Sequence, residues 1–438
     1  MFISLVCVLD WDWLTATAIG RIGTWAISAW YIAILLQGIA CVSYLEMASM
    51  FKDTSGSLPV FVHNAFKKYG EFPGALASWG YVIGWGAAPI ALVIFAGYFV
   101  QETLFPSLNI TYFATVVLLA VFLINYLGVD VWSRVSSLIS VTVIISLVVC
   151  IGTWFLPPSS LENAAGFAYA GESPDLFSFI GIVYILAWSA YSSENVFSLT
   201  AEYKDPVKDT KKALITTIAY FILGTTFVTL TYMHTLSVNT MLENPYTPLL
   251  PLSSMLAGHR GEFVVMCAMV LGLVLNMNSC FIAASRVLYQ NGKEGTNLKQ
   301  FGYLNKHNSP HAALFFIFLL NLFMVIMFGE EPIAILRAGD VGYFVTVILA
   351  NLSAFMLRRQ MPDAERPYRA PDIFIYLSLG IAGINFILVT VGIWSWGITR
   401  VLISLSLLLT FLPLYYYRKL VQDKREKPNL SLDTPASV

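Results

Sequence analysis

Long apolar stretches separated by short polar loops dominate the chain. A helix needs about 20 predominantly apolar residues to cross a bilayer core of roughly 30 Å. Eleven stretches come close to that length, near residues 26–50, 74–104, 110–129, 135–157, 176–200, 213–236, 262–289, 311–329, 332–357, 373–396 and 399–417. The pattern therefore predicts an all-α polytopic membrane protein.

The first residues form a further, atypical apolar segment. Residues 2–9 are largely apolar, but Asp10 and Asp12 follow at once, after only as much chain as would rise about 14 Å in a helix. No basic region precedes this segment and no small-residue cleavage site follows it, so a signal peptide is not expected. We predict a short first span, which brings the total to twelve.

A second polar interruption lies in the sixth span of this count. The apolar run that reaches Trp188 gives way to Ser189, Ser192, Ser193 and Glu194. Polar or irregular backbone at membrane depth is tolerated only where it is buried or lines a cavity. Spans 1 and 6 each head a set of five spans, which predicts a 5+5 inverted repeat with broken helices 1 and 6 around a midplane site.

This arrangement predicts the organisation of the whole chain. We expect residues 1–157 and 158–372 to form the two five-helix repeats, residues 373–417 two additional helices, and residues 418–438 a polar tail. Basic residues accumulate in cytoplasmic loops. All Lys and Arg residues except Arg21, Arg260, Arg337 and Arg400 fall on one side of the predicted membrane, so the C-terminal tail is expected in the cytoplasm.

Composition supports this class and excludes others. The chain is 57% hydrophobic and 12% charged, against roughly 25% charged in soluble domains, and its net charge of -1 offers nothing to a nucleic acid. The cysteines form no CxxC motif and no Cys/His metal spacing, and HExxH and GxSxG motifs are absent from the sequence. We therefore expect no enzyme activity, metal or cofactor.

Four polar segments next to predicted spans carry the most specific motifs. They are SYLEMASMF at 43–51 with TSGS at 54–57, Glu194 with EYKDP at 202–206 and KKA at 211–213, ASRVLY at 284–289 with Gly292 and residues 305–310, and RRQMPD at 358–363 with RPYRAP at 366–371. In this order and at these spans they resemble the amino acid/polyamine/organocation (APC) superfamily of permeases, over roughly residues 25–371.

The resemblance implies a secondary active transporter, a permease or antiporter, for an amino acid or related amine in a plasma or bacterial inner membrane. A bundle of spans 1, 2, 6 and 7 would rock against the rest around a small-molecule site between the two broken helices. The coupling ion, H+ or Na+, stays open, as does exchange without an ion. An alternative is a transport-incompetent nutrient receptor that kept the permease fold.

The first span departs from the pattern of these permeases. Where they carry a glycine-rich break, this chain has Leu9, Asp10, Trp11, Asp12 and Trp13. An acid would repel a substrate carboxylate, so either Asp10 or Asp12 binds the amine of the substrate, or the break lies elsewhere. The alternative is that these acids and tryptophans sit at the membrane interface.

Other candidates come from polar or aromatic residues inside spans. Trp188, Ser189, Ser192 and Ser193 would supply an aromatic wall and hydroxyl partners to the substrate, unless they only pack helices together. By its position in the resemblance, Glu194 is a gating or proton-sensing acid, with a structural hydrogen bond as the alternative.

The remaining candidates have packing roles as strong alternatives. Tyr81 and Trp85 on span 3 could line the cavity, and Asn278 on span 8 could bind ion or substrate. Arg337 and Asp340 are three residues apart and could pair on one helix face as a structural or outer-gate element. Glu46 is expected to be a cytoplasmic structural or inner-gate residue.

Overall fold

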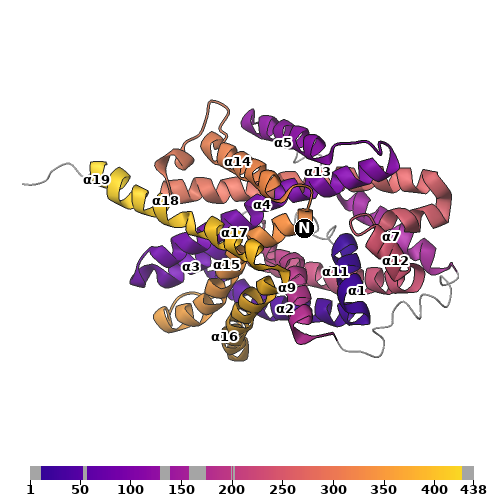
Figure 1. Ribbon diagram of the computed structural model, residues 1–438. Coiled ribbons are helices and arrows are strands. Elements are labelled where there is room, and N and C mark those ends of the chain that lie inside the picture. Colours follow the sequence, from indigo (N-terminus) through magenta and orange to yellow (C-terminus); the bar gives the residue numbers. More distant parts are fainter. Residues whose placement is uncertain are drawn as a thin grey trace, which may run out of the picture.

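The computed structural model describes residues 11–52, 57–128, 139–156, 174–198, 200 and 203–426. Every regular element in these residues is a helix, and the helices form one bundle (Figure 1). Asp10 and Cys7 lie outside the described residues, as does most of the tail expected at 418–438.

The helix bounds follow the apolar pattern of the sequence. The α-helices are α1 Trp11–Ile22, α2 Ala26–Met50, α3 Ser57–Phe66, α4 Phe72–Thr103, α5 Ile110–Tyr126, α7 Ile139–Trp154, α9 Leu176–Tyr191, α10 Asn195–Ser198, α11 Pro206–Thr235, α12 Val238–Glu243, α13 Leu249–Glu294, α14 His311–Phe328, α15 Pro332–Gln360, α16 Asp372–Ile387, α17 Ile398–Leu409, α18 Phe411–Tyr417 and α19 Asp423–Glu426. Short 3-10 or π turns are η2 Gly23–Trp25, η3 Lys67–Tyr69, η6 Ser192–Glu194, η8 Lys299–Gly302, η9 Leu388–Gly392, η10 Ile393–Trp396 and η11 Arg418–Gln422.

Within the described residues, nine helical segments are long and apolar enough to cross a membrane, and two shorter apolar helices, α5 and α7, accompany them. Together they coincide with the eleven predicted stretches. The twelfth segment is described only from Trp11, as α1, which continues through the short turn η2 into α2. The chain is therefore a multi-pass helical membrane protein, while the count of twelve spans and the inverted repeat stay predictions.

Helix ends are set by local chemistry. Asn109, Asp175 and Asp205 each precede a helix, and their side chains accept a hydrogen bond from the backbone N–H three residues later. The long helix α13 contains a sharp kink, because Ala257 and Gly258 have non-helical backbone angles, with φ +55° at Gly258. The part of α13 after this kink contains the eighth predicted span.

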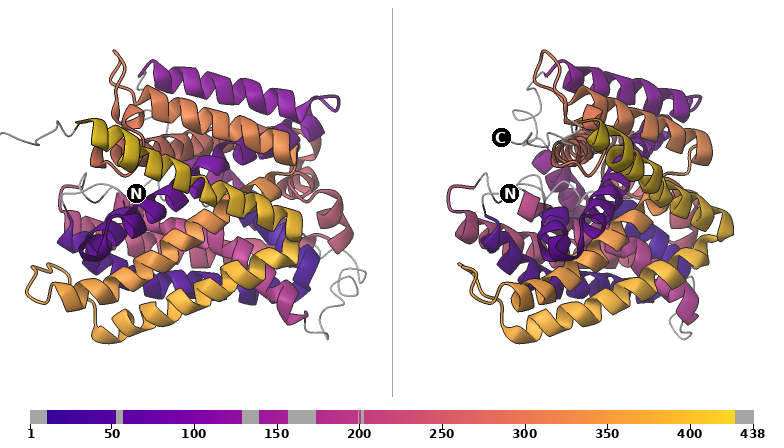
Figure 2. Two further views of the ribbon diagram at one scale, coloured as in Figure 1. Left: turned by 60° about the vertical axis from the view of Figure 1, so that its left-hand side comes forward. Right: turned by 90° about the vertical axis from the view of Figure 1, so that its left-hand side faces the viewer.

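Helix α4 occupies the centre of the bundle, packed between α13 and α15 (Figure 2). Glycines make the contact with α15 close: a Cβ atom at Gly80 would meet the main chain at Gly342, and one at Gly84 would meet the Tyr343 side chain at 2.6 Å. Small residues allow two helix backbones to approach in this way. The α4–α15 pair is therefore a closely packed support for the polar residues it carries.

Asn321 on α14 bonds two backbone groups of α4 next to a proline. Pro89 lies inside that helix and has no N–H to donate. The Asn321 amide donates to the Gly86 carbonyl at 2.8 Å and accepts from the Ile90 N–H at 2.8 Å. This residue is fully buried, so it satisfies two backbone groups that the helix leaves open beside Pro89.

The periphery of the bundle is apolar and exposed. Helices α5 and α14 run side by side along one edge (Figures 1 and 2), and α16 packs against α15 and α2. Large apolar side chains such as Leu123 on α5, Ile326 on α14 and Phe386 on α16 point away from the protein interior. This is the pattern expected of helices that face lipid.

Candidate functional site

The sixth predicted span is interrupted in the core of the bundle. Helix α9 ends at Tyr191, the 3-10 turn η6 covers Ser192–Glu194, and α10 follows from Asn195. All three residues of the turn are buried. The break is a single tightened turn, since Ser192 keeps right-handed helical angles (φ −57°, ψ −17°).

Because of the 3-10 turn, the Tyr191 carbonyl bonds to side chains of other helices and not to its own helix. The Asn195 N–H points to the Ser192 and Ser193 carbonyls. It therefore does not donate to the Tyr191 carbonyl, as it would in an α-helix. The Tyr191 carbonyl instead accepts from Gln37 Nε2 on α2 at 3.0 Å and from the Tyr343 hydroxyl on α15 at 3.1 Å. Two distant helices thus hold the break.

Glu194 connects the break to α3 and makes a second contact with α15. Its Oε2 accepts a hydrogen bond from the Ser57 hydroxyl on α3, and its Oε1 from the Tyr343 hydroxyl at 3.4 Å. The side chain is fully buried. The next residue, Asn195, accepts from the Tyr81 hydroxyl on α4 at 3.1 Å. A movement of α10 relative to α3 or α15 would therefore have to break these hydrogen bonds.

Aromatic rings line α4 and α15 beside this break. Trp85 lies 6.1 Å from Trp188, 5.7 Å from Tyr343 and 6.2 Å from Tyr81, measured between ring centroids. All four side chains are buried. The Trp85 indole N–H faces the Glu194 carboxylate but makes no hydrogen bond of regular geometry in the described residues. The structure therefore brings together the predicted residues Tyr81, Trp85 and Trp188 with Glu194.

The serines of the break serve its local geometry. The Ser192 hydroxyl donates to the Ser189 carbonyl at 2.6 Å, and the Ser193 hydroxyl to the Ala190 carbonyl at 3.1 Å. Such bonds to carbonyls one turn earlier are common where serine interrupts a helix. Both hydroxyls therefore act on the turn itself in this structure.

The start of α1 forms a second polar cluster. Asp12 is buried, and its Oδ1 accepts a hydrogen bond from the Tyr232 hydroxyl on α11 at 3.2 Å. Trp11 packs on α11, with its ring against Gly224 and 5.0 Å from the Tyr220 ring. Trp13 stacks on Phe95 of α4 at 4.2 Å. These residues lie in the protein interior.

The two clusters meet through their helices. Helix α1 packs against α9, but no described contact joins Asp12 to Glu194. The indole N–H groups of Trp11 and Trp13 are buried without an acceptor among the described residues. The start of α1 thus combines a buried carboxylate, Asp12, with two buried N–H donors.

Asn278 has a packing partner. Its side-chain oxygen accepts a hydrogen bond from Asn125 Nδ2 on α5 at 2.7 Å. Such inter-helical amide bonds are common between membrane helices. In this structure Asn278 therefore joins α13 to α5.

Arg337 and Asp340 are both buried on α15, one turn apart. Neither carboxylate oxygen of Asp340 has a hydrogen-bond partner among the described residues, so the two side chains interact through charge and not through a direct bond. Arg337 also lines a cavity of about 260 Å³. The cavity lies between α1, the α12 region and the start of α15, and is lined by Ala16, Thr17, Gly20, Arg21, Met241, Leu242, Pro245, Tyr246, Glu331, Ile333, Ala334 and Arg337.

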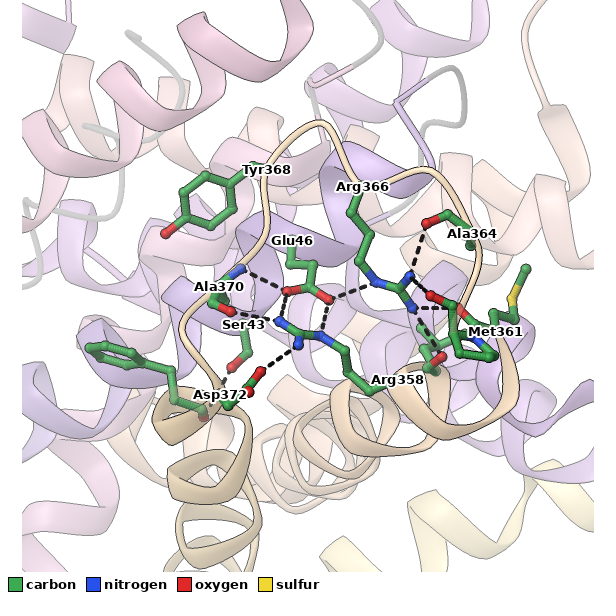
Figure 3. A network of polar contacts seen from close by, with 12 residues as sticks. Ser43, Glu46, Arg358, Met361, Ala364, Arg366, Tyr368, Ala370 and Asp372 are labelled. Carbon is green, nitrogen blue, oxygen red and sulfur yellow. Dashed lines mark hydrogen bonds and ion pairs between the residues drawn. The ribbon is translucent and has the colours of Figure 1, made fainter.

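Glu46 lies at the opposite end of α15 in a saturated network (Figure 3). Arg358 donates to both of its oxygens at 2.6 Å, Arg366 donates at 3.0 Å, and the Ala370 N–H donates at 2.8 Å. Burial and the Glu46 carboxylate raise the pKa of Tyr368 in the same loop. With four donors engaged, Glu46 fixes the loop between α15 and α16 onto α2.

Three polar residues of these networks were not predicted from the sequence. Gln37, Asn321 and Tyr343 are each an isolated polar group in an otherwise apolar stretch. A lone amide at the centre of a span is a usable signal, because an unpartnered polar group in hydrocarbon is costly. Their partners lie more than a hundred residues away, which the local pattern does not reveal.

Comparison with known proteins gives a consistent result. The sequence family described as amino acid permease matches residues 13–417. The chain is 26% identical over 420 residues to the lysine-specific permease LysP of Escherichia coli, covering 86% of this chain and 84% of LysP. It is 22% identical over 409 residues to the branched-chain amino acid permease BcaP of Bacillus subtilis (86% and 83% covered), and 23% over 444 residues to the glutamate/serine transporter AimA of that bacterium (95% and 80%).

Proposed function

This chain belongs to the amino acid permease family of the APC superfamily, and on that premise we propose that it is a secondary active transporter that carries an amino acid or a related amine by alternating access. The site lies between the start of α1 and the junction of α9 with α10. The protein works in a plasma or bacterial inner membrane with its C-terminus in the cytoplasm.

The observation that carries the proposal is the buried break at Ser192–Glu194. The 3-10 turn in the core frees the Tyr191 carbonyl from its own helix, and transporters with discontinuous helices use such freed backbone groups. The Tyr191 carbonyl, held by Gln37 and Tyr343, shows how this backbone is used by neighbouring helices. A substrate that competes for such bonds would change how those helices sit together.

The donors and acceptors of the region complement an amino acid. Asp12 is a buried carboxylate whose single described hydrogen bond comes from a neutral hydroxyl, and a substrate ammonium would supply the missing positive charge. Asp10 is a second candidate for this role. The buried indole N–H of Trp11 or of Trp13, beside Asp12 in the sequence, would donate to the substrate carboxylate.

Glu194 has the position of a gate. It ties the break to α3 and α15, and an alternating-access movement of α10 would exchange these bonds for others. Ser189, Ser192 and Ser193 would keep the turn intact while it moves. Glu46 would anchor the loop at the far end of α15, since its donors are all within the protein.

The similar proteins do not identify the side chain of the substrate. Their names include lysine, branched-chain amino acids, glutamate and serine, so membership of the family does not select one. The common chemistry is an ammonium group next to a carboxylate. The proposed contacts concern that common part.

Counterflow in proteoliposomes tests the proposal. Vesicles containing purified protein are loaded with an unlabelled mixture of leucine, lysine, serine and glutamate, and each radiolabelled amino acid is then offered outside. We expect transient accumulation of at least one of the four, absent from protein-free vesicles. Saturable binding to the purified protein without counterflow of any of them would contradict transport.

A further inference from the structure

Asp340 is a buried acid that the proposed substrate contacts do not use. It lies on α15 with an exposed fraction of 0%, and both of its carboxylate oxygens lack a hydrogen-bond partner among the described residues. Buried charged groups are almost always paired or hydrogen-bonded, because removing a carboxylate from water is costly. A carboxyl group in this setting is suited to carry a proton.

The titratable and charged groups around Asp340 come from several helices. Arg337 is one turn away on α15, Tyr184 and Tyr191 face it from α9, and Tyr343 follows one turn deeper on α15. At the level of Tyr343, α2 contributes Tyr44 and α4 contributes Tyr81. Arg337 is the single cation of the set, and each tyrosine is neutral at ordinary pH.

These groups form a line down one face of α15. Arg337 lines the cavity of about 260 Å³ near the start of the helix, and Asp340 and Tyr343 follow at successive turns. The Tyr343 hydroxyl reaches Glu194 at 3.4 Å. Asp340 therefore lies between the cavity and the gate.

The surroundings favour a proton over a metal cation. A sodium ion needs several oxygen ligands, which transporters supply from unwound backbone. Asp340 lies within a regular stretch of α15, where carbonyls are engaged in the helix, and no cluster of three His, Cys, Asp or Glu side chains able to hold a metal occurs in the described part of the chain. The guanidinium of Arg337 would also repel a metal cation.

We propose that Asp340 binds the proton that drives net transport. In the state open to the cavity of Arg337, a proton from water adds to a carboxylate oxygen and gives the neutral acid. In the state open to the other side, the same proton leaves to water and the carboxylate returns. This inference rests on the proposed transport function and names its driving ion.

Proton binding changes the charge beside Arg337. An ionised Asp340 attracts the guanidinium, and the neutral acid does not. Because Arg337 lines the cavity together with residues of α1, this change acts on the cavity wall that the two helices share. Protonation is thereby coupled to the helix that carries Asp12.

The test separates proton-driven uptake from exchange in proteoliposomes, using the labelled amino acid that gives counterflow. In the unaltered protein we expect an inward-directed pH gradient to drive accumulation, together with substrate-dependent acidification reported by an entrapped pH dye. In Asp340→Asn, which keeps the shape of the neutral acid, gradient-driven accumulation and acidification should fall by at least about tenfold while counterflow persists. The matched control is Asp363→Asn, an exposed acid in the loop after α15, which should behave like the unaltered protein.

Three results would overturn the inference. One is counterflow in the unaltered protein with no response to a pH gradient, which leaves the transport function standing. Another is gradient-driven accumulation that survives in Asp340→Asn. If Asp340→Asn loses counterflow as well, Asp340→Glu decides: it keeps a titratable acid and should retain gradient-driven uptake with an altered pH profile, and failure to do so contradicts the role. Absence of counterflow in the unaltered protein would instead contradict the transport function itself.

Discussion

The Tyr343 hydroxyl donates a hydrogen bond to the main-chain carbonyl of Tyr191 at 3.1 Å. The donor is on α15 and the acceptor is the last residue of α9, so a tertiary contact holds the place where the sixth predicted span stops being an α-helix. Gln37 makes a second bond to the same carbonyl. Side chains from α2 and α15 thus hold the end of α9 at the break.

Tyr343→Phe should impair transport more than folding. The substitution removes the bonds to the Tyr191 carbonyl and to Glu194, but Gln37 still satisfies that carbonyl. We expect a loss of about 1 kcal/mol in unfolding free energy and a fall of at least about tenfold in initial uptake rate. Thermal unfolding in detergent and uptake measure the two effects.

Tyr112→Phe, at an exposed tyrosine on α5, is the control for removing a hydroxyl group. It should leave both quantities unchanged. If Tyr343→Phe transported at the normal rate, the hydrogen bonds at the break would have no part in the movement.

Asp12→Asn should weaken recognition of the amine. The amide keeps a hydrogen-bond acceptor for Tyr232 but loses the charge that would hold an ammonium group. A charge-assisted contact contributes about 2 kcal/mol, so kcat/KM should fall roughly thirtyfold with the protein still folded. Initial uptake rates over a range of substrate concentrations give the value, and Glu243→Gln, an exposed acid on α12, is the control. An unchanged kcat/KM would remove Asp12 from the site.

Glu46→Gln should loosen the loop between α15 and α16. Arg358 and Arg366, both partly buried, would remain beside a neutral amide, and removing the buried acid from its ion pairs costs about 3 kcal/mol. The Ala370 N–H would also lose its anionic acceptor. Because Arg369 is exposed, trypsin should cut the Arg369–Ala370 bond faster in this variant.

The matched control for the loop is Glu365→Gln, which removes an exposed acid from the same segment. Its tryptic cleavage rate and thermal stability should equal those of the unaltered protein. Equal cleavage of Glu46→Gln and Glu365→Gln would show that the Glu46 network does not fix the loop.

Asn321→Leu should destabilise α4 at Pro89. The substitution keeps the size of the side chain but leaves the Gly86 carbonyl and the Ile90 N–H without partners in the core. We expect a loss of about 2 kcal/mol in unfolding free energy, measured by thermal unfolding in detergent. Asn64→Leu, where the amide bonds only a carbonyl of its own helix, should cost less. Equal losses would mean that Asn321 is an ordinary packing residue.

Much of the fold could be predicted from the sequence, because apolar stretches and helix boundaries are local properties. The stretch predicted at 26–50 is α2 to the residue, and the polar run after Trp188 marked the place where α9 gives way to a 3-10 turn. Tyr81, Trp85 and Trp188 lie next to one another, while their role as cavity residues stays a prediction.

The contacts across the bundle could not be predicted in this way. Nothing local to Gln37 or Tyr343 says that both would meet the Tyr191 carbonyl, and nothing local to Asn278 says that its partner would be Asn125. The spacing of Arg337 and Asp340 suggested a direct pair, but their side chains interact without a hydrogen bond. Such contacts depend on how helices pack, which the periodicity of one helix does not determine.

Access to the break from both sides of the membrane tests the central claim most directly. Ser192→Cys is introduced into protein whose native cysteines are replaced, and a membrane-impermeant thiol reagent is applied from either side of proteoliposomes. His259→Cys, exposed at the kink of α13, is the control that substrate should not affect. Alternating access predicts labelling of Ser192→Cys from both sides, slowed by saturating substrate, whereas no labelling from either side, or labelling that substrate leaves unchanged, would contradict it.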